Sequence, residues 1–345
     1  MARIVLADDG IVFDGRSPEA GPLGGVESAI VYLTRELAAR GHEVLVRNNC
    51  SRAEVIDGVD WAPISDGLPE TADLYIANRG DKLLPLMPKA RRTVFWIHNP
   101  ARYLMKWRYL SKLWRLKPAI VFLGDYHVTT YPAWAPGAER IVIPYGIADA
   151  FLHARPRENT PPRRAIFTSN PLRSLDWLLE LWARDIRPRV PDAELHLFTG
   201  AATYGAVGDA KNEAMENVLA RARDLASAGV VLRGPVSKPQ LIQEFRDARM
   251  MLYKGDINET FCLAVGEAQA AGVPAVVQRL GSVVERVIDG KTGAVAATDQ
   301  AFAEAAVRLL ENDDLWRRQH LAALDKQGRW GWPQAAAAFE ELIPA

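Results

Sequence analysis

Short apolar runs recur along the whole chain, and stretches with the spacing of amphipathic helices separate them. Alternation of this kind predicts parallel β-sheets whose strands are joined by helices. After the run Arg3–Ala7, for example, Gly24-Gly25 precedes a helical pattern that stops at Gly41, and a second run follows at once. The strand-like runs of the first part are residues 3–7, 42–46, 74–77, 93–97, 119–123 and 140–143.

The pattern breaks at Pro144-Tyr145-Gly146, and a segment rich in Pro and Arg follows at residues 153–164. These features predict a crossing between two domains. We therefore expect a domain over residues 1–148, a second domain over 149–322, and a last helix in 323–345 that returns to the first domain. The strand-like runs of the second domain are residues 164–168, 194–198, 230–232, 250–253, 275–277 and 293–295.

The sequence thus predicts two doubly wound, Rossmann-like α/β domains that face each other across a cleft. Ligands of such sheets bind at the carboxyl ends of the strands. A donor and an acceptor could then meet in the cleft.

Composition narrows the class of protein. The chain has 345 residues, with 42 Lys+Arg and 42 Asp+Glu, so net charge alone attracts neither nucleic acid nor an anionic membrane. No apolar run reaches the length of a membrane span, and Asp8-Asp9 interrupts any signal-peptide core, so we expect a cytoplasmic protein. Cys50 and Cys262 are too few for a disulfide framework or a cysteine-based metal site.

The segment Asn258–Val277 carries the most chemical information. Glu259 and Glu267 lie eight residues apart, and a helix is expected to begin near Phe261 or Cys262. The N–H groups at a helix start can hold a diphosphate without a metal. The two carboxylates can accept hydrogen bonds from sugar and ribose hydroxyls. This spacing therefore suits a phosphorylated sugar.

At these residues the chain resembles the retaining glycosyltransferases of the GT-B fold, in particular glycosyltransferase family 4, which carries two Glu residues separated by seven. Other segments resemble family elements in the expected order and cover most of both domains. They are Gly24–Glu27 with residues 37–45 (first loop and helix), 141–147 (domain switch), 169–176 (diphosphate loop), 232–237 (base-contacting loop) and 287–293.

The resemblance implies roles for single residues. It implies that Glu259 contacts the donor sugar, that Glu267 holds the ribose, and that Arg173 neutralises the leaving phosphate. The family commonly has an Arg before the cation of this loop, where this chain has Asn170, so a second cation is not identified. The remaining implied donor contacts are Asn170, the backbone of Phe261, Cys262 and Leu263, the loop around Val236, the turn Gly24-Gly25, and His98 as a third member of the catalytic set.

The implied function is a metal-independent, retaining transfer of a hexose-type sugar from a nucleoside diphosphate sugar to a hydroxyl acceptor. The nucleotide sugar is a substrate, and no cofactor is expected. A UDP-sugar epimerase and a catalytically inactive sugar-nucleotide binding module share the architecture and stay open as alternatives. A nicotinamide oxidoreductase is disfavoured, because Gly21–Gly25 does not give the G-x-G-x-x-G pattern.

Purely structural roles also stay open for the single residues. Arg173 could be a solvated surface residue, His98 a hydrogen-bonded core residue, and Gly24-Gly25 a simple turn. The two carboxylates could be an ordinary loop and helix pair, although their strand, loop and helix context favours function.

Six basic residues without an acid stand out at residues 102–117, and aromatic residues recur among them at helical spacing. Interfacial helices combine these features, but an ordinary helix packed on its own domain does so too. The first alternative predicts peripheral contact with the inner face of the membrane and a lipid-linked or anionic glycan acceptor, as in lipopolysaccharide, capsule or exopolysaccharide synthesis. Nucleic acid is not expected. The basic residues are Arg102, Lys106, Arg108, Lys112, Arg115 and Lys117, and the aromatic-apolar ones are Tyr103, Trp107, Leu110 and Trp114.

Overall fold

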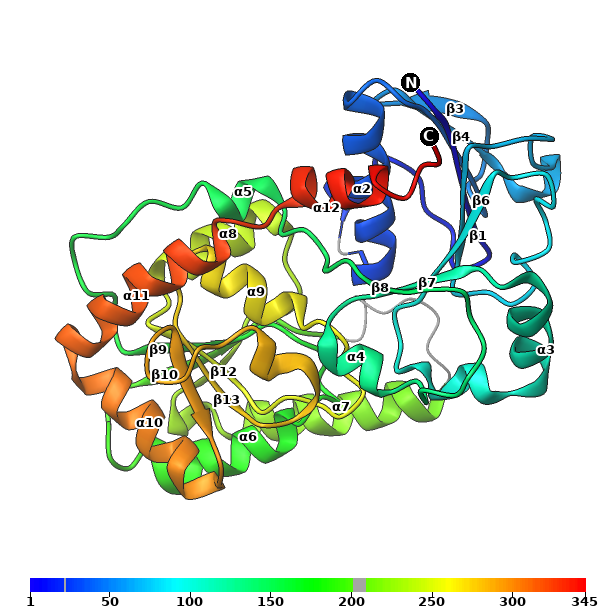
Figure 1. Cartoon of the computed structure of the whole chain (residues 1–345). Coiled ribbons are helices and arrows are strands. Elements are labelled where there is room, and N and C mark those ends of the chain that lie inside the picture. Colours follow the sequence, from blue (N-terminus) through cyan, green and yellow to red (C-terminus); the bar gives the residue numbers. More distant parts are fainter. Residues whose placement is uncertain (22, 201–208) are drawn as a thin grey trace. The chain divides into compact units, whose positions relative to one another are not determined.

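A computed structural model describes residues 1–21, 23–200 and 209–345 of the chain. The chain divides into two compact units, each built around its own β-sheet (Figure 1). The first unit comprises Met1–Ala20, Gly25–Gly146 and Trp330–Ala345, and the second comprises Gly21–Gly24 and Ile147–Arg329.

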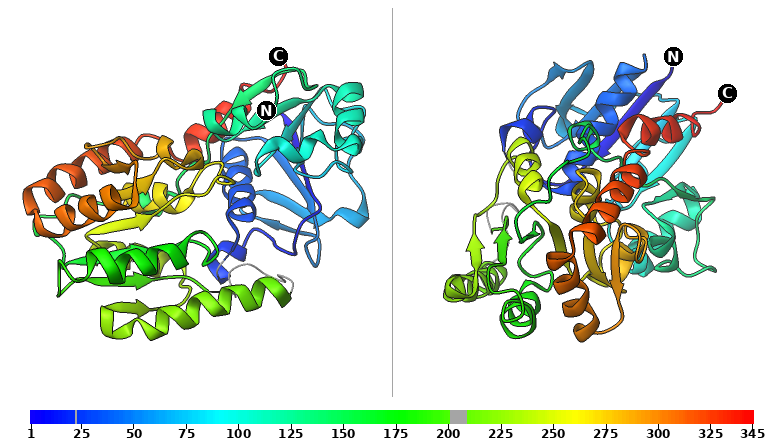
Figure 2. Two further views of the ribbon diagram at one scale, coloured as in Figure 1. Left: turned by 90° about the horizontal axis from the view of Figure 1, so that it is seen from below. Right: turned by 90° about the vertical axis from the view of Figure 1, so that its left-hand side faces the viewer.

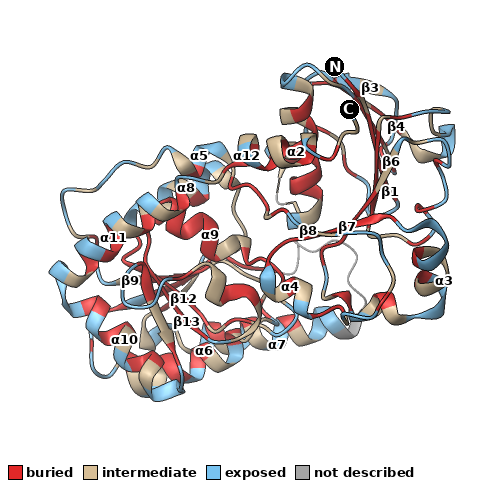
Figure 3. Ribbon diagram, in the orientation of Figure 1, coloured by how far each residue is buried: buried red, intermediate tan, exposed pale blue. Residues whose placement is uncertain are grey.

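The sheet of the first unit has the strand order β3-β4-β2-β1-β5-β6-β7-β8. Every neighbouring pair is parallel except β3 and β4, which form an antiparallel hairpin. The central strands are buried on both faces, as Figure 3 shows, because helices cover a parallel sheet on both sides. The strands are β1 (Arg3–Asp8), β2 (Glu43–Asn48), β3 (Glu54–Ile56), β4 (Val59–Pro63), β5 (Leu74–Asn78), β6 (Arg92–Trp96), β7 (Ala119–Phe122) and β8 (Arg140–Val142).

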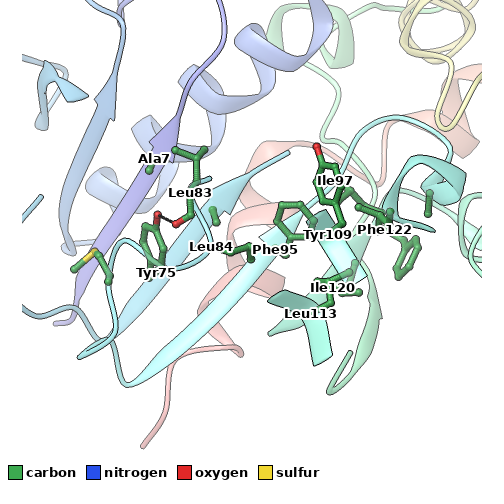
Figure 4. Packing of buried hydrophobic residues seen from close by; sticks show 14 of the residues in the cluster. Ala7, Tyr75, Leu83, Leu84, Phe95, Ile97, Tyr109, Leu113, Ile120 and Phe122 are labelled. Atoms are coloured by element: carbon green, nitrogen blue, oxygen red, sulfur yellow. Dashed lines mark hydrogen bonds between the residues drawn. The ribbon is translucent and has the colours of Figure 1, made fainter. Parts of the chain in front are cut away.

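Alternate strand residues build a hydrophobic core on one face of this sheet. Tyr75, Phe95 and Ile120 point to that face, where Tyr109 and Leu113 of helix α3 (Trp107–Leu116) meet them (Figure 4). The hydroxyl of Tyr75 donates a hydrogen bond to the carbonyl of Leu83 at 2.7 Å, so its polar atom is satisfied within the core. The other helical segments of this part are α1 (Ser17–Ala20), α2 (Gly25–Ala39), η1 (Ile64–Asp66), η2 (Ala101–Met105) and α4 (Asp125–Thr129).

The last helix, α12 (Trp332–Glu340), belongs to the first unit and packs against α2. Phe339 contacts Trp96 with a ring-centroid distance of 5.2 Å. Gly146 and Trp332 lie so close that a Cβ on Gly146 would stand 2.3 Å from the Trp332 nitrogen. The segments that leave and re-enter the first unit are therefore packed on each other.

The second unit has a six-stranded sheet with the order β11-β10-β9-β12-β13-β14, and all its pairs among the described residues are parallel. Figure 2 shows α6 and α7 side by side in this unit. Its strands are β9 (Arg164–Phe167), β10 (Glu194–Leu197), β11 (Val230–Leu232), β12 (Met250–Tyr253), β13 (Ala275–Gln278) and β14 (Gly293–Ala296). Its helical segments are α5 (Asp149–Leu152), α6 (Leu175–Leu181), the π-helical η3 (Trp182–Ile186), α7 (Asp209–Asp224), η5 (Ala226–Ala228), α8 (Lys238–Asp247), α9 (Leu263–Ala270), η6 (Gly281–Glu285), α10 (Asp299–Glu311) and α11 (Asp313–Gln327).

The predicted fold class, two Rossmann-like parallel-sheet domains, is confirmed. In the second sheet the chain proceeds from β9 to β10 and β11 in one direction, and β12 starts the other direction. The carboxyl ends of β9 and β12 thus form the topological switch point, where doubly wound sheets bind their ligands.

Candidate functional site

Two predicted residues meet at the switch point of the second unit. Arg173 follows β9 and Glu259 follows β12, and Arg173 Nη1 donates a hydrogen bond to Glu259 Oε2 at 2.7 Å. The hydroxyl of Tyr253, the last residue of β12, donates to the same carboxylate oxygen. Tyr253 did not emerge from the sequence, because a core tyrosine at a strand end carries no pattern of its own.

Charge and burial act in opposite directions on Arg173. Burial acts to lower the pKa of the guanidinium, but Glu259, Tyr253 and Asp256 together outweigh it, so the pKa of Arg173 is raised overall. Burial also raises the pKa of Tyr253. Arg173 therefore stays a cation and Tyr253 stays a hydrogen-bond donor at the switch point.

Asn170 shapes the loop that carries Arg173. Its side-chain oxygen accepts a hydrogen bond from the Leu172 N–H at 2.8 Å, and its carbonyl accepts from the Arg173 N–H at 2.9 Å. This Asx-type turn fixes the direction in which Arg173 leaves the strand. Asn170 thus has a local structural role in addition to its predicted contact with the donor.

The loop of Glu259 is pinned to the neighbouring loop at Gly281. The carbonyl of Glu259 accepts from the Ser282 N–H at 3.1 Å, while its own N–H donates to the Asp256 carbonyl at 2.9 Å. Gly281 has a φ of +60°, and a Cβ there would lie 2.1 Å from the Asp256 oxygen. Only glycine fits this position without displacing the loop.

Helix α9 begins directly after Phe261 and Cys262, as the sequence predicts to within two residues. Cys262 is the N-cap residue, with a φ of 66°, and it offers a buried thiol in place of the oxygen of a usual cap. The positive end of the helix dipole at Leu263 thus lies beside the Glu259 loop. Such a helix start favours an anion.

Glu267 lies one turn further along α9 and is buried. Both of its oxygens accept from Lys238 Nζ, at 2.5 and 2.7 Å. Lys238 is the first residue of α8, and Val236, the predicted base-contacting residue, lies two residues before it. The sequence did not single out Lys238, because its pairing depends on how α8 and α9 pack.

His98 belongs to a buried network of the first unit. Asn78 Nδ2 donates to Asp8 Oδ1 at 2.6 Å, so Asn78 Oδ1 is left to accept from His98 Nε2. His98 Nδ1 then accepts from the hydroxyl of Tyr145. Burial lowers the pKa of His98 well below its usual value, so the ring is neutral. Its contact with a donor sugar stays a prediction.

Gly25 is the first residue of α2, and Gly24 precedes it, as expected for a turn at a helix start. Near them, Glu27 accepts from Arg79 Nη2 at 2.9 Å, and Arg79 also pairs with the buried Asp8. The acidic pair Asp8-Asp9 is thus partly neutralised by a cation. Among the described residues, no group of three or more His, Cys, Asp or Glu side chains gathers in a metal-binding arrangement.

The basic segment differs in part from its prediction. The helix begins at Trp107, so Tyr103 lies outside it in η2. Asp81, from another segment, pairs with Lys112 at 2.6 Å and with Arg108 at 3.5 Å. The helix buries Tyr109 and Leu113, whereas Trp107 and Trp114 are 79% and 72% exposed.

Comparisons with known proteins agree with this fold. Residues 164–312 match the family model described as Glycosyl transferases group 1. Sucrose-phosphate synthase from Thermosynechococcus elongatus has a TM-score of 0.75 at 15% identity, over 99% of this chain and 98% of that one. HepE from Anabaena, solved with UDP and glucose, has a TM-score of 0.72 at 14% identity over 99% of both chains.

The chain has the GT-B fold of glycosyltransferases. Over 141 residues, the chain is 34% identical in sequence to D-inositol 3-phosphate glycosyltransferase of Streptomyces scabiei. These residues are 40% of this chain and 31% of the relative. The relative from Streptomyces bingchenggensis is 30% identical over 204 residues, 56% of this chain and 44% of its own. The GT-B chain thus spans about a third to a half of the length of these two relatives.

Proposed function

We propose that this protein is a retaining, metal-independent glycosyltransferase that moves a sugar from a nucleoside diphosphate sugar to a hydroxyl acceptor. The observation that carries the proposal is the Arg173–Glu259–Tyr253 cluster at the switch point, directly before the start of α9. The match of residues 164–312 to glycosyl transferases supports it, as do structural neighbours whose titles name UDP or UDP-glucose.

In this proposal the second unit binds the donor. The start of α9 and Arg173 hold the diphosphate, Glu259 accepts hydrogen bonds from the sugar hydroxyls, and Glu267 accepts them from the ribose. The guanidinium has five N–H donors, and its hydrogen bond to Glu259 uses Nη1, so it retains donors for a phosphate oxygen. Arg173 can therefore serve both groups at once.

The reaction breaks the bond between the anomeric carbon and the phosphate oxygen and forms the bond to the acceptor oxygen on the same face of the sugar. The leaving phosphate takes the proton of the acceptor hydroxyl. Arg173 and the helix start stabilise the charge that develops on that phosphate, which is the largest contribution in many enzymes of group transfer. A fixed guanidinium supplies this positive charge without a metal ion.

A panel of nucleotide sugars tests the proposal. We expect one donor to raise the melting temperature in proportion to the logarithm of its concentration, and to release its sugar to an alcohol acceptor with retained configuration in the presence of EDTA. Inverted configuration, or activity that needs magnesium or manganese, would contradict the mechanism. Conversion of a UDP-sugar without transfer would favour an epimerase, and binding without turnover an inactive binding module.

For the acceptor we propose a lipid-linked or anionic envelope glycan, held near the membrane by α3. Trp107 and Trp114 are exposed on the helix, and Arg102, Lys106 and Arg115 of the same segment are exposed as well. Aromatic and basic side chains that share an exposed face favour an anionic lipid surface. No helix in the described part of the chain is long and apolar enough to cross a membrane.

Vesicle sedimentation tests this surface. We expect binding that requires anionic lipid and weakens with salt, and that the joint change of Arg102, Lys106 and Arg115 to Glu abolishes. The matched control is Lys112→Glu, because Lys112 already pairs with Asp81. Equal sedimentation with neutral and anionic vesicles would exclude this acceptor surface.

A further inference from the structure

Arg286 is a largely buried cation whose guanidinium has no hydrogen-bond acceptor among the residues that the structure describes. It follows η6, and its side chain is 14% exposed. Its ion pair with Glu285 is 3.9 Å long, beyond hydrogen-bond length, and within the described residues its side chain donates no hydrogen bond. The buried Nε has no partner there either. Buried charged groups are normally paired, so this arrangement calls for an explanation.

A second cation, Lys326 of α11, lies close to the first. Lys326 Nζ donates to the Glu285 carbonyl at 3.2 Å, and Gln327 donates to the Arg286 carbonyl at 3.3 Å, so the end of α11 holds this loop in place. Burial lowers the pKa of Arg286, and burial together with repulsion from Arg286 lowers the pKa of Lys326. Two cations share one carboxylate, so the local charge is positive.

The position of Arg286 connects it to the candidate site. Its guanidinium carbon lies 4.4 Å from the centroid of the Phe261 ring, and its Cδ would be 4.0 Å from a Cβ on Gly266. The side chain therefore runs along the first turn of α9 toward its start. Arg173 reaches Glu259, two residues before Phe261, from the β9 side.

The structure assigns Arg286, supported by Lys326, as a second cation that binds a phosphate oxygen of the nucleoside diphosphate beside the start of α9. This inference rests on the proposed function and deepens it, because the loop with Arg173 offers Asn170 where a second cation is expected. Stacking on Phe261 orients the guanidinium. The face of the Phe261 ring, however, cannot accept the hydrogen bonds that the guanidinium N–H groups donate in the plane of the guanidinium. An oxyanion supplies acceptors in that plane.

The decisive variant is Arg286→Met, which keeps the apolar stem and removes the charge. The probe is whichever of uridine, guanosine, adenosine or thymidine diphosphate the wild type binds most tightly by calorimetry. We expect the variant to bind this diphosphate at least about tenfold more weakly, because it loses a hydrogen bond from a charged group. Its affinity for the corresponding nucleoside, which has no phosphate, should equal that of the wild type. Arg318→Met, an exposed residue of α11, is the matched control and should change neither affinity.

Thermal unfolding without ligand separates this role from a structural one. Removing an uncompensated buried charge should leave the melting temperature equal or raise it, whereas a structural cation–π role predicts a decrease. Unchanged diphosphate affinity in Arg286→Met overturns the inference and leaves the proposed function standing. A wild type that binds none of the four diphosphates overturns both. If Arg286→Met does not fold, Arg286→Lys and Lys326→Met decide the question by the same affinity measurement.

Discussion

At the scale of single residues, Glu259 is the clearest test of chemistry. Glutamine has the same shape as glutamate, so Glu259→Gln should leave the fold intact while it removes a charge that pairs with Arg173 and that we propose contacts the sugar. We expect turnover to fall by on the order of a hundredfold in a steady-state assay with the identified donor. Glu213→Gln, on the exposed surface of α7, is the control. Unchanged turnover of Glu259→Gln would remove this residue from the reaction.

His127 provides a prediction about pH. Its Nδ1 accepts from the Leu123 N–H at 3.1 Å and its Nε2 donates to the Asn99 carbonyl at 2.9 Å, so the neutral ring is built into the fold. Burial lowers the pKa of His127 to about 4. Between pH 6.5 and 4 the unfolded chain binds a proton that the folded chain does not bind. The free energy of unfolding is therefore complete above pH 6.5 and falls as the pH drops toward 4.

The loss is on the order of 3 kcal/mol for this one group. Urea denaturation at a series of pH values measures it. The buried His98 contributes with the same sign, so His127→Gln should reduce the slope without abolishing it. A slope equal to that of the wild type would show that His127 is not held neutral.

At the scale of elements, Gly281 fixes how two loops of the second unit pack. Gly281→Ala should cost more than about 3 kcal/mol, because it adds a backbone clash to the cost of a left-handed alanine. Gly290→Ala is the control, since Gly290 has a φ of +71° and open space around it, so only about 1–2 kcal/mol is expected. Equal losses by chemical denaturation would show that the loop yields to the added methyl group.

Most strands and helices could be predicted, because buried parallel strands are continuous apolar runs and several helices, such as α2, α8 and α12, begin at Gly or directly after Ser or Gly. The hairpin β3–β4 was missed. Its signal is the pair Asp57-Gly58 between Ile56 and Val59, where both residues have positive φ, as in a two-residue hairpin turn. The strand β3 has only three residues, and one of its two apolar side chains, Val55, is exposed, so no continuous apolar run marks it in the sequence.

The candidate site was predictable only where local pattern and chemistry coincide. Glu259, Glu267 and the start of α9 share one segment, so their spacing shows in the sequence. Lys238 and Arg286 reach the site from other segments, and only packing brings them to Glu267 and Phe261. The exposure of Trp107 likewise depends on which face of α3 packs against the core.

At the scale of the whole molecule, the first unit depends on the end of the chain. Phe339 is buried against Trp96, so Phe339→Ala should lower the stability of the first unit by about 3–5 kcal/mol. Hydrogen exchange should show faster exchange in β1 and no change in β12. Phe302→Ala, in α10, is the reciprocal control and should affect β12 instead. Equal effects on both strands would mean that the two units unfold together.

The return of α12 to the first unit also orders events during synthesis. Residues 147–329 leave the ribosome before α12 does, so the second unit can complete its sheet while the first still lacks its last helix. Synthesis of residues 147–329 at about 5–20 residues per second takes roughly ten seconds or longer. During that time the surface around Trp96 that Phe339 later covers stays open to chaperones, and a nascent chain stalled near residue 330 should bind them through its first unit.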